Sequence, residues 1–263
     1  MAVYSDLETL LVDVDDHVAT LTLNIPETGN AMNGRLHEQL AEAFYLLGGD
    51  DDVYVIVITG AGDAFCGGGD VSYIRDLHPR EYDDVFRTVR RLVQNILSLD
   101  KPLIAALNGN CVGVGATIAV NSDIIIAGEG IDIMDPHVKA GITAGDGGAL
   151  MWALNAGFPA ARYHLLTGEP MPAERALQIG LINEVLPRDE VLIRATAIAR
   201  QLADGPGQAI RGTKRIFAKV AELLGAGVFE FAAELERVSL YSEDHKEAIQ
   251  AHFEEREPVF NHR

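Results

Sequence analysis

The sequence predicts an α/β fold, and three observations support this prediction. Two short, continuous apolar runs, at residues 54–60 and 101–107, are typical of strands that are buried on both faces. A glycine-rich loop follows each run directly, at residues 61–69 and 108–115. Segments with helical periodicity come after these loops. Strand, glycine loop and helix in succession are the order in which an α/β fold builds a ligand site at the ends of its strands.

The N-terminal third contains a hairpin, a helix and the first buried strand. Residues 8–24 alternate apolar and polar side chains about the turn DVDDH, which predicts a β-hairpin. Residues 30–50 have helical periodicity and end in a Gly-Gly pair that acts as a helix stop. The run at 54–60 predicts the buried strand, and the polar segment at 79–99 predicts a further helix.

The middle of the chain repeats this order. Residues 101–109 predict a second buried strand that leads into a glycine turn, residues 116–122 a short helix, and residues 123–129 another strand. Residues 141–157 read as a loop that leads into a helix. From about residue 171 the pattern is helical to the end of the chain, and the break near Gly168–Pro170 is a subdomain boundary at most.

Composition and charge narrow the possible functions. The chain has 263 residues, of which 48% are hydrophobic and 23% charged, and these values fit one globular domain with a sizeable core. The net charge of −18 leaves little room for the basic face that nucleic-acid binding requires. An anionic ligand would have to be held by a local cluster of Lys and Arg, or by backbone amides.

The cysteines and the N-terminus predict a soluble cytoplasmic protein. Cys66 and Cys111 are too few for a disulfide framework, and neither has a second thiol or a histidine at the spacing of a metal site. The N-terminal stretch lacks a basic start and an apolar core, and no apolar run reaches membrane-spanning length. We therefore expect no metal, no membrane and no nucleic acid.

The two glycine loops are candidates for holding a ligand through exposed backbone amides. Both nucleotide-binding motifs fail, because Ile118 stands where a dinucleotide fingerprint needs its third glycine and no G-K-[ST] sequence occurs. Two readings remain open. The loops form an oxyanion hole, in which two amides converge on a carbonyl oxygen, or they are purely structural turns.

Five segments together resemble the crotonase, or enoyl-CoA hydratase/isomerase, superfamily over essentially the whole chain. They are AFCGGGDV, KPLIAALNG, GVGATIAVNSDIIIA, LLTGEPMPAERALQIGLINEVLP and SEDHKEAIQAHFEEREPVF. The resemblance implies a crotonase-type spiral of ββα turns with the active site in residues 1–170. It also implies a helical subdomain, residues 171–263, that covers the ligand pocket and packs into trimers or pairs of trimers.

The resemblance further implies that two backbone amides hold an acyl-CoA thioester carbonyl. Carried over by motif, the amides fall on Gly67 and Val114. Valine replaces the usual middle glycine, but the donor is a main-chain N–H, so the role survives while the isopropyl group narrows the pocket or tilts the amide. Cys66, Gly68 and Gly113 flank the two donors and are expected at the substrate, although nothing near Cys66 in sequence would make a reactive thiolate.

The two glutamates that a hydratase of this family uses are both absent. The first position falls on Thr117, whose hydroxyl cannot act as a base near neutral pH and at best positions water. The second falls on His137, and an imidazole can act as base and then as acid. Asp146, nine residues later, enters the same implied cavity and would fix the tautomer of His137. The alternatives are that Asp146 caps the following helix and that His137 is a hydrogen-bonded pocket wall.

A second, local resemblance is to the β-diketone hydrolase (6-oxocamphor hydrolase-like) branch of the superfamily. It lies in DPHVKAGITAGDGGALMW, which contains Trp152, and in RYHLLTGEPM. His37 and Glu236 match site positions of that branch, and the alternative for each is a solvated helix residue. Val114 departs from the branch, which has a histidine there. We place Trp152, His37 and Glu236 among the substrate-binding candidates.

Coenzyme A is the expected carrier part of the substrate, with no tightly bound cofactor. Lys214 and Arg215 are the candidates for its phosphates, and in the family such residues can come from a neighbouring subunit. Arg35 and Lys101 are weaker candidates. Asp70, Asp123 and Asp135 are expected to cap or pin local backbone.

Three hypotheses follow. The leading one is a lyase or isomerase that acts on an acyl-CoA or related carbonyl compound through an enolate, with His137 oriented by Asp146. The second is a CoA-independent hydrolase that cleaves a C–C bond of a β-diketone. The third is a catalytically silent oligomer that binds acyl-CoA or a protein partner.

Overall fold

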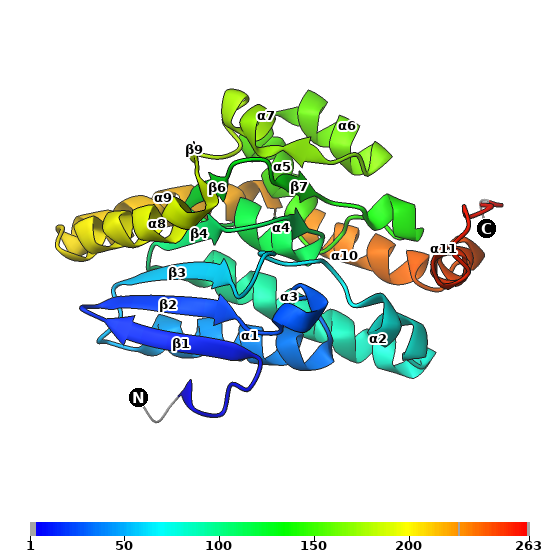
Figure 1. The fold of residues 1–263 in the computed structure, drawn as a ribbon, viewed down its shortest axis with the longest axis horizontal. Helices are drawn as coiled ribbons and strands as arrows, with labels where there is room; N and C mark the ends of the chain where they lie inside the picture. The colour runs from blue at the N-terminus through cyan, green and yellow to red at the C-terminus, as the bar shows by residue number, and fades with distance from the viewer. Residues whose placement is uncertain (1–3, 226, 262–263) are drawn as a thin grey trace.

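A six-stranded sheet runs through the centre of the computed structural model, which describes residues 4–225 and 227–261 (Figure 1). The strand order is β1-β2-β3-β4-β6-β9, and all neighbours are parallel except the hairpin β1-β2. The α/β prediction is confirmed. The strands are β1 Leu10–Asp15, β2 Val18–Leu23, β3 Val55–Gly60, β4 Leu103–Leu107, β6 Ile124–Gly128 and β9 Glu184–Leu186.

A second, three-stranded sheet stands beside the carboxyl ends of the main strands. Its order is β5-β7-β8, with β5 parallel and β8 antiparallel to β7. It lies where the chain passes from the second glycine loop to the segment that contains His137. The strands are β5 Cys111–Val112, β7 Asp132–Met134 and β8 Met171–Pro172.

Helices cover both faces of the main sheet and form the C-terminal end of the chain. The α-helices are α1 Gly34–Gly49, α2 Val71–Asp76, α3 Tyr82–Ser98, α4 Val114–Val120, α5 Gly148–Ala156, α6 Phe158–Thr167, α7 Ala173–Gln178, α8 Arg188–Ala203, α9 Gly207–Gly225, α10 Val228–Ser239 and α11 Glu243–Phe253. Three short 3₁₀ helices are η2 Pro26–Thr28, η3 Pro79–Glu81 and η4 His137–Ala140.

The predicted N-terminal elements are confirmed in place and type. Val18 pairs with Asp15, so the hairpin turns through Asp16 and His17 alone, both with positive φ. The side chain of Asn33 accepts the amide of Leu36 and caps the N-terminus of α1.

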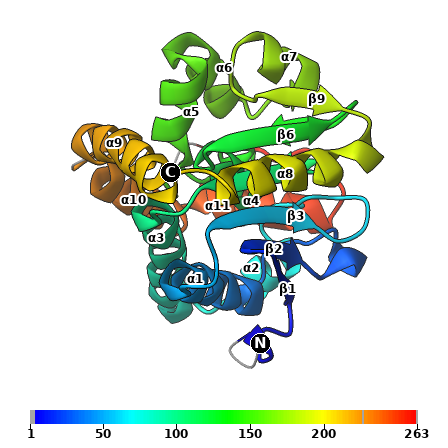
Figure 2. The ribbon, with the colours of Figure 1, turned by 90° about the vertical axis from the view of Figure 1, so that its left-hand side faces the viewer.

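Alternating side chains of the strands divide the core into two layers. Ile56 and Ile58 of β3 face the larger cluster, together with apolar residues of α1, α3 and α4. Val55 and Val57 face the smaller cluster, which α8 closes with Val191 and neighbouring alanines. Figure 2 shows α8 across one face of the sheet, with α1 and α3 side by side at the other. Burial on both faces explains why the strands are apolar without alternation.

The prediction that the chain is helical from residue 171 onward is wrong in part. β8 and β9 lie in this region, and β9 pairs with β6 at the edge of the main sheet. Helix α8 also packs on β3, β4 and β6. The expected division at residue 170 is therefore crossed by sheet pairing, and the purely helical part is α9 to α11. Within the described residues, no helix combines the length and the apolar character that crossing a membrane requires.

Candidate active site

A cavity of about 260 Å³ lies where the two glycine loops meet η4 and the helices α1, α2, α3, α10 and α11. Its wall is mostly apolar and contains most of the predicted site residues. Those that line it are His37, Gly67, Gly68, Gly113, Val114, His137, Asp146 and Glu236. A larger and more open hollow of about 750 Å³, beside Tyr4 and Asp50, contains none of them.

In the described part of the two glycine loops, two cavity-lining residues have a backbone amide without an acceptor, and they are not the pair that the sequence predicted. The Gly67 N–H donates to the Gly29 carbonyl at 2.8 Å, and the Gly113 N–H donates to the Met134 carbonyl at 2.8 Å. The amides of Gly69 and Val114 find no acceptor in the part of the chain that the structure describes. Val114 stays a predicted donor, whereas the prediction for Gly67 is wrong because its amide already donates to Gly29. Gly69 is the available donor.

Glycine is required at the point where the two loops approach each other. The backbone φ angles of Gly68 and Gly113 are 91° and 55°, values that residues with a side chain rarely adopt. A Cβ added to Gly113 would lie 3.5 Å from the Cα of Gly68 and 4.0 Å from the amide nitrogen of Gly69. The Gly69 amide therefore lies directly across from the turn that begins α4, whose first residue is Val114. This arrangement places two unpaired donors on facing turns of a mostly apolar wall.

Cys66 lies behind the first loop and does not line the cavity. Its side chain is fully buried, and burial raises the pKa of the thiol to about 11, although hydrogen bonds from the Gly68 and Gly115 amides oppose this rise. The substrate-binding prediction for Cys66 is therefore wrong, because an inaccessible neutral thiol cannot contact a ligand.

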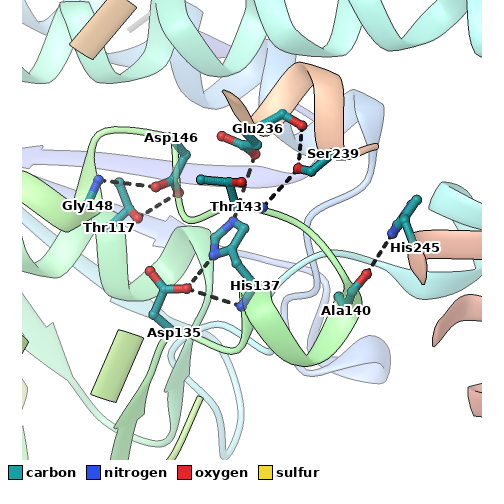
Figure 3. Close-up of polar contacts among 10 residues, drawn as sticks. All are labelled: Thr117, Asp135, His137, Ala140, Thr143, Asp146, Gly148, Glu236, Ser239 and His245. Atoms are coloured by element: carbon teal, nitrogen blue, oxygen red, sulfur yellow. Dashed lines mark hydrogen bonds and ion pairs between the residues drawn. The ribbon is translucent and has the colours of Figure 1, made fainter. Parts of the chain in front are cut away.

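His137 is held by Asp135, not by Asp146 (Figure 3). The Nδ1 of His137 contacts Oδ1 of Asp135, whose side chain is fully buried, and the same oxygen accepts the His137 amide at 3.3 Å. The predicted backbone role of Asp135 is thus confirmed, and the carboxylate also fixes the ring. Burial alone would lower the pKa of His137, but Asp135 and, further away, Asp146 and Glu236 raise the pKa well above its usual value. The Nδ1 contact leaves Nε2 free for chemistry.

Asp146 reaches the cavity from the other side and holds Thr117. The hydroxyl of Thr117 donates to Oδ2 of Asp146 at 2.6 Å, and the Gly148 amide donates to Oδ1 at 3.1 Å. Burial raises the pKa of Asp146, and the charge of His137 opposes the rise. Thr117 is 1% exposed and does not line the cavity, so it supports Asp146 and does not bind substrate as predicted.

Glu236 of α10 completes the polar part of the site. Its Oε1 lies 3.9 Å from Nε2 of His137, and its Oε2 is buried without a partner. Burial raises the pKa of Glu236 to about 8, and His137 counteracts this effect. At neutral pH Glu236 is therefore mainly a neutral carboxylic acid beside the imidazole. Within the described residues, no group of three or more His, Cys, Asp or Glu side chains is arranged to hold a metal ion.

The burial of Glu236 predicts an alkaline loss of stability. Folding favours the protonated form of the Glu236 carboxyl. The stability that this group contributes is therefore fully present below its ordinary pKa of 4.5 and is lost as pH rises through about 8. We expect a loss on the order of 2–4 kcal/mol over this range. Urea unfolding at pH 5 and pH 9 measures it, and the Glu236→Gln variant should lose clearly less. An equal loss in both proteins would contradict the buried neutral carboxyl.

Two further histidines line the cavity. His37 is 8% exposed, its Nδ1 is buried without a partner, and burial lowers its pKa to about 4. The substrate-binding position predicted for His37 is therefore inside the cavity and not on a solvated helix face. His245 of α11 was not predicted, because nothing in the sequence around it distinguishes it from a surface histidine.

Three predicted ligand contacts lie away from the cavity. Trp152 is fully buried in the core, with its indole nitrogen unpaired. Lys214 donates to Asp123 and to the Lys101 carbonyl, both at 2.7 Å, and Arg215 pairs with Asp100 at 2.8 Å. The substrate-binding prediction for Trp152 is wrong, and the two cations do not line this chain's own cavity.

Comparisons with known proteins agree with this fold. The family model for enoyl-CoA hydratase/isomerase matches residues 13–263. A probable enoyl-CoA hydratase of Mycobacterium tuberculosis, echA8, is 31% identical over 97% of this chain and 99% of its own length. The 1,2-epoxyphenylacetyl-CoA isomerase of Escherichia coli is 31% identical over 97% and 98%.

Solved structures show the same likeness in three dimensions. A crystal structure of an enoyl-CoA hydratase/isomerase from Mycobacterium paratuberculosis superimposes with a TM-score of 0.89 at 33% identity, covering 92% of this chain and 97% of that one. The predicted crotonase-type fold is thereby confirmed. This chain belongs to the enoyl-CoA hydratase/isomerase family of the crotonase superfamily.

Proposed function

We propose that the protein is an enzyme that acts on an acyl-CoA thioester or a related carbonyl compound through an enolate. The single observation that carries the proposal is the meeting, in one cavity, of two unpaired amides and a carboxylate-held imidazole. The Gly69 and Val114 amides would bind the carbonyl oxygen as it gains negative charge. The names of the relatives, which include CoA thioester enzymes, support a CoA-linked substrate.

His137 would move the proton between the substrate carbon and the site. Its raised pKa favours the imidazolium, the form that donates a proton to the enolate carbon. Its neutral form, with the ring fixed by Asp135, takes a proton through Nε2. Thr117 and His137 replace the two glutamates of a family hydratase, so we expect slow hydration of a simple enoyl-CoA.

Alanine substitutions at two glycines, Gly113 and Gly130, test the role of the Gly69 and Val114 amides. In Gly113→Ala the new methyl group lies 4.0 Å from the Gly69 nitrogen, so turnover of an acyl-CoA substrate should fall by about 10²-fold. Gly130→Ala is the matched control, because Gly130 has φ of 67° and open space around its Cβ direction. Kinetics and thermal unfolding are measured for both variants. Equal losses of turnover would show that backbone strain, and not the amide site, is responsible.

The second candidate is a CoA-independent hydrolase of a β-diketone. The observation that favours it is the chemistry of the wall, where His37 and Glu236 join His137 and no Lys or Arg is among the lining residues. Neutral His137 takes a proton from water, and the water oxygen bonds to one carbonyl carbon. The bond between that carbon and its neighbour breaks, and its electron pair passes into an enolate that the two amides hold. Protonation of the enolate gives a ketone and a carboxylic acid.

Isotope incorporation separates the two candidates. The protein is incubated in ¹⁸O water with a cyclic 1,3-diketone and, separately, with crotonyl-CoA and acetoacetyl-CoA. One ¹⁸O atom in a ring-opened carboxylate supports the hydrolase. Turnover of the CoA substrates alone supports the thioester enzyme. Binding without any turnover favours the catalytically silent oligomer over both.

We also propose that the protein assembles into a homotrimer or a dimer of trimers. One surface of α9 and α10 exposes many large apolar side chains, an arrangement that marks interaction sites. They are Ile216, Phe217, Val220, Leu223, Leu224, Val228, Phe231, Leu235 and Val238. Sedimentation equilibrium measures the assembly, and a Phe217→Glu variant should dissociate it. A monomeric wild-type protein would contradict the proposal.

A further inference from the structure

We propose that His245 is a positioning residue, whose hydrogen bond to the Ala140 carbonyl holds the η4 turn so that His137 keeps its working geometry. The inference rests on the proposed function, since it takes His137 as the proton-transfer group. His245 lies 105 residues from Ala140 in sequence, and its Nδ1 lies 2.7 Å from the Ala140 oxygen. Ala140 ends the turn that His137 begins (Figure 3).

The hydrogen bond is partly buried, with the histidine as its buried partner. His245 is 2% exposed, and burial lowers its pKa, so the ring is neutral near pH 7. Because the Ala140 oxygen can only accept, the single ring proton lies on Nδ1. A partly buried carbonyl that lost this donor would lose its protein partner, which weakens the hold on the turn.

Backbone packing places the start of α11 directly on the turn. Gly141 has φ of 68°, and a Cβ there would lie 2.8 Å from backbone atoms of Asp244 and His245. The side chain of Ser242 accepts the His245 amide at 3.0 Å and so fixes the first turn of α11. No larger residue fits at position 141 without moving α11, so the helix and the turn are positioned together.

A second contact, made by Ser239, joins the chain after η4 to α10. Ser239 accepts the Thr143 amide at 2.9 Å and donates to the Glu236 carbonyl at 2.7 Å. The Ser239 contact holds the chain after the η4 turn, whereas the His245 hydrogen bond holds the turn itself. Helices α10 and α11 thus fix the segment that carries His137 relative to Glu236, and the His245 bond is the contact made to the turn itself.

Two substitutions at one position test the role. His245→Leu removes the donor, whereas the side-chain nitrogen of His245→Asn reproduces the Nδ1 donor. We expect kcat to fall by about 10-fold in His245→Leu with a much smaller change in KM, because small displacements of a reacting group are costly. His245→Asn should recover most of kcat. His252→Leu, an exposed position of the same helix, is the matched control.

The ring signals of His137 provide a readout that does not depend on activity. In ¹³C-histidine-labelled protein, the shift and titration of the His137 Cε1–H resonance should change in His245→Leu and remain as in wild type in His245→Asn and His252→Leu. Unchanged His137 signals in His245→Leu would overturn the inference. If His245→Leu does not fold, His245→Gln replaces it. The amide nitrogen of Gln lies one bond further from the backbone than that of Asn, so this variant should also give altered His137 signals. If His137→Ala retains full turnover, the proposed function fails, but the resonance test of His245 still decides the inference.

Discussion

The His137→Ala variant is expected to lose turnover by about 10²–10⁴-fold while it keeps its fold. The imidazole is the only side chain in the cavity that combines a contact to a buried carboxylate with a ring nitrogen free toward the substrate, within the residues that the structure describes. Steady-state kinetics on the best substrate among crotonyl-CoA, acetoacetyl-CoA and the cyclic 1,3-diketone measures turnover. Circular dichroism and thermal unfolding measure whether the fold is kept.

The His252→Ala variant is the control for this experiment, because it removes an exposed imidazole from α11. It should leave kcat within about two-fold of wild type, since surface substitutions usually change little. Turnover of His137→Ala equal to that of the control would remove His137 from the mechanism, and with it the proton-transfer part of the proposal.

The Asp135→Asn variant is expected to move the His137 limb of the pH–kcat profile to lower pH. Asp135 raises the pKa of His137 through both its charge and its contact to Nδ1. Loss of the carboxylate therefore lowers that pKa, whichever protonation state the rate-limiting step requires. We also expect kcat at its optimum to fall by about 10²-fold, because the ring loses the group that fixes its tautomer.

Asp146→Asn is the comparison variant for Asp135→Asn. Asp146 acts on His137 only through its charge, while its own hydrogen bonds go to Thr117 and Gly148. Its substitution should shift the same limb by less. A larger shift in Asp146→Asn than in Asp135→Asn would show that Asp146 is the partner of His137, as the sequence alone predicted.

The main features of the fold could be predicted because their signals are local. The runs that become β3 and β4 are apolar at every position, since both faces of the sheet are covered. The strands β5, β7, β8 and β9 are two or three residues long, too short to show any periodicity. They form only because distant partners lie beside them, which explains why the region after residue 171 was predicted to be helical.

The candidate site, like the fold, has residues that the sequence predicts and contacts that only the structure reveals. Val114 and His137 could be located because the family resemblance assigns both to motif positions. The choice of Gly69 over Gly67 depends on which amide is already bonded, and this follows from the approach of residue 29. Asp135 lies just before the η4 turn, and its carboxylate folds forward onto the amide and the ring of His137, a side-chain placement that the sequence does not reveal.

The central claim is that the two amides stabilise an enolate, and one spectroscopic titration tests it most directly. Wild type and Gly113→Ala are titrated with acetoacetyl-CoA and with a small cyclic 1,3-diketone, and the enolate absorbance is followed. We predict that at least one ligand gives a saturable enolate band in wild type and that the Gly113→Ala variant weakens it by about 10-fold or more. Saturable binding with an enolate band from neither ligand, or a band of equal strength in both proteins, would contradict the claim.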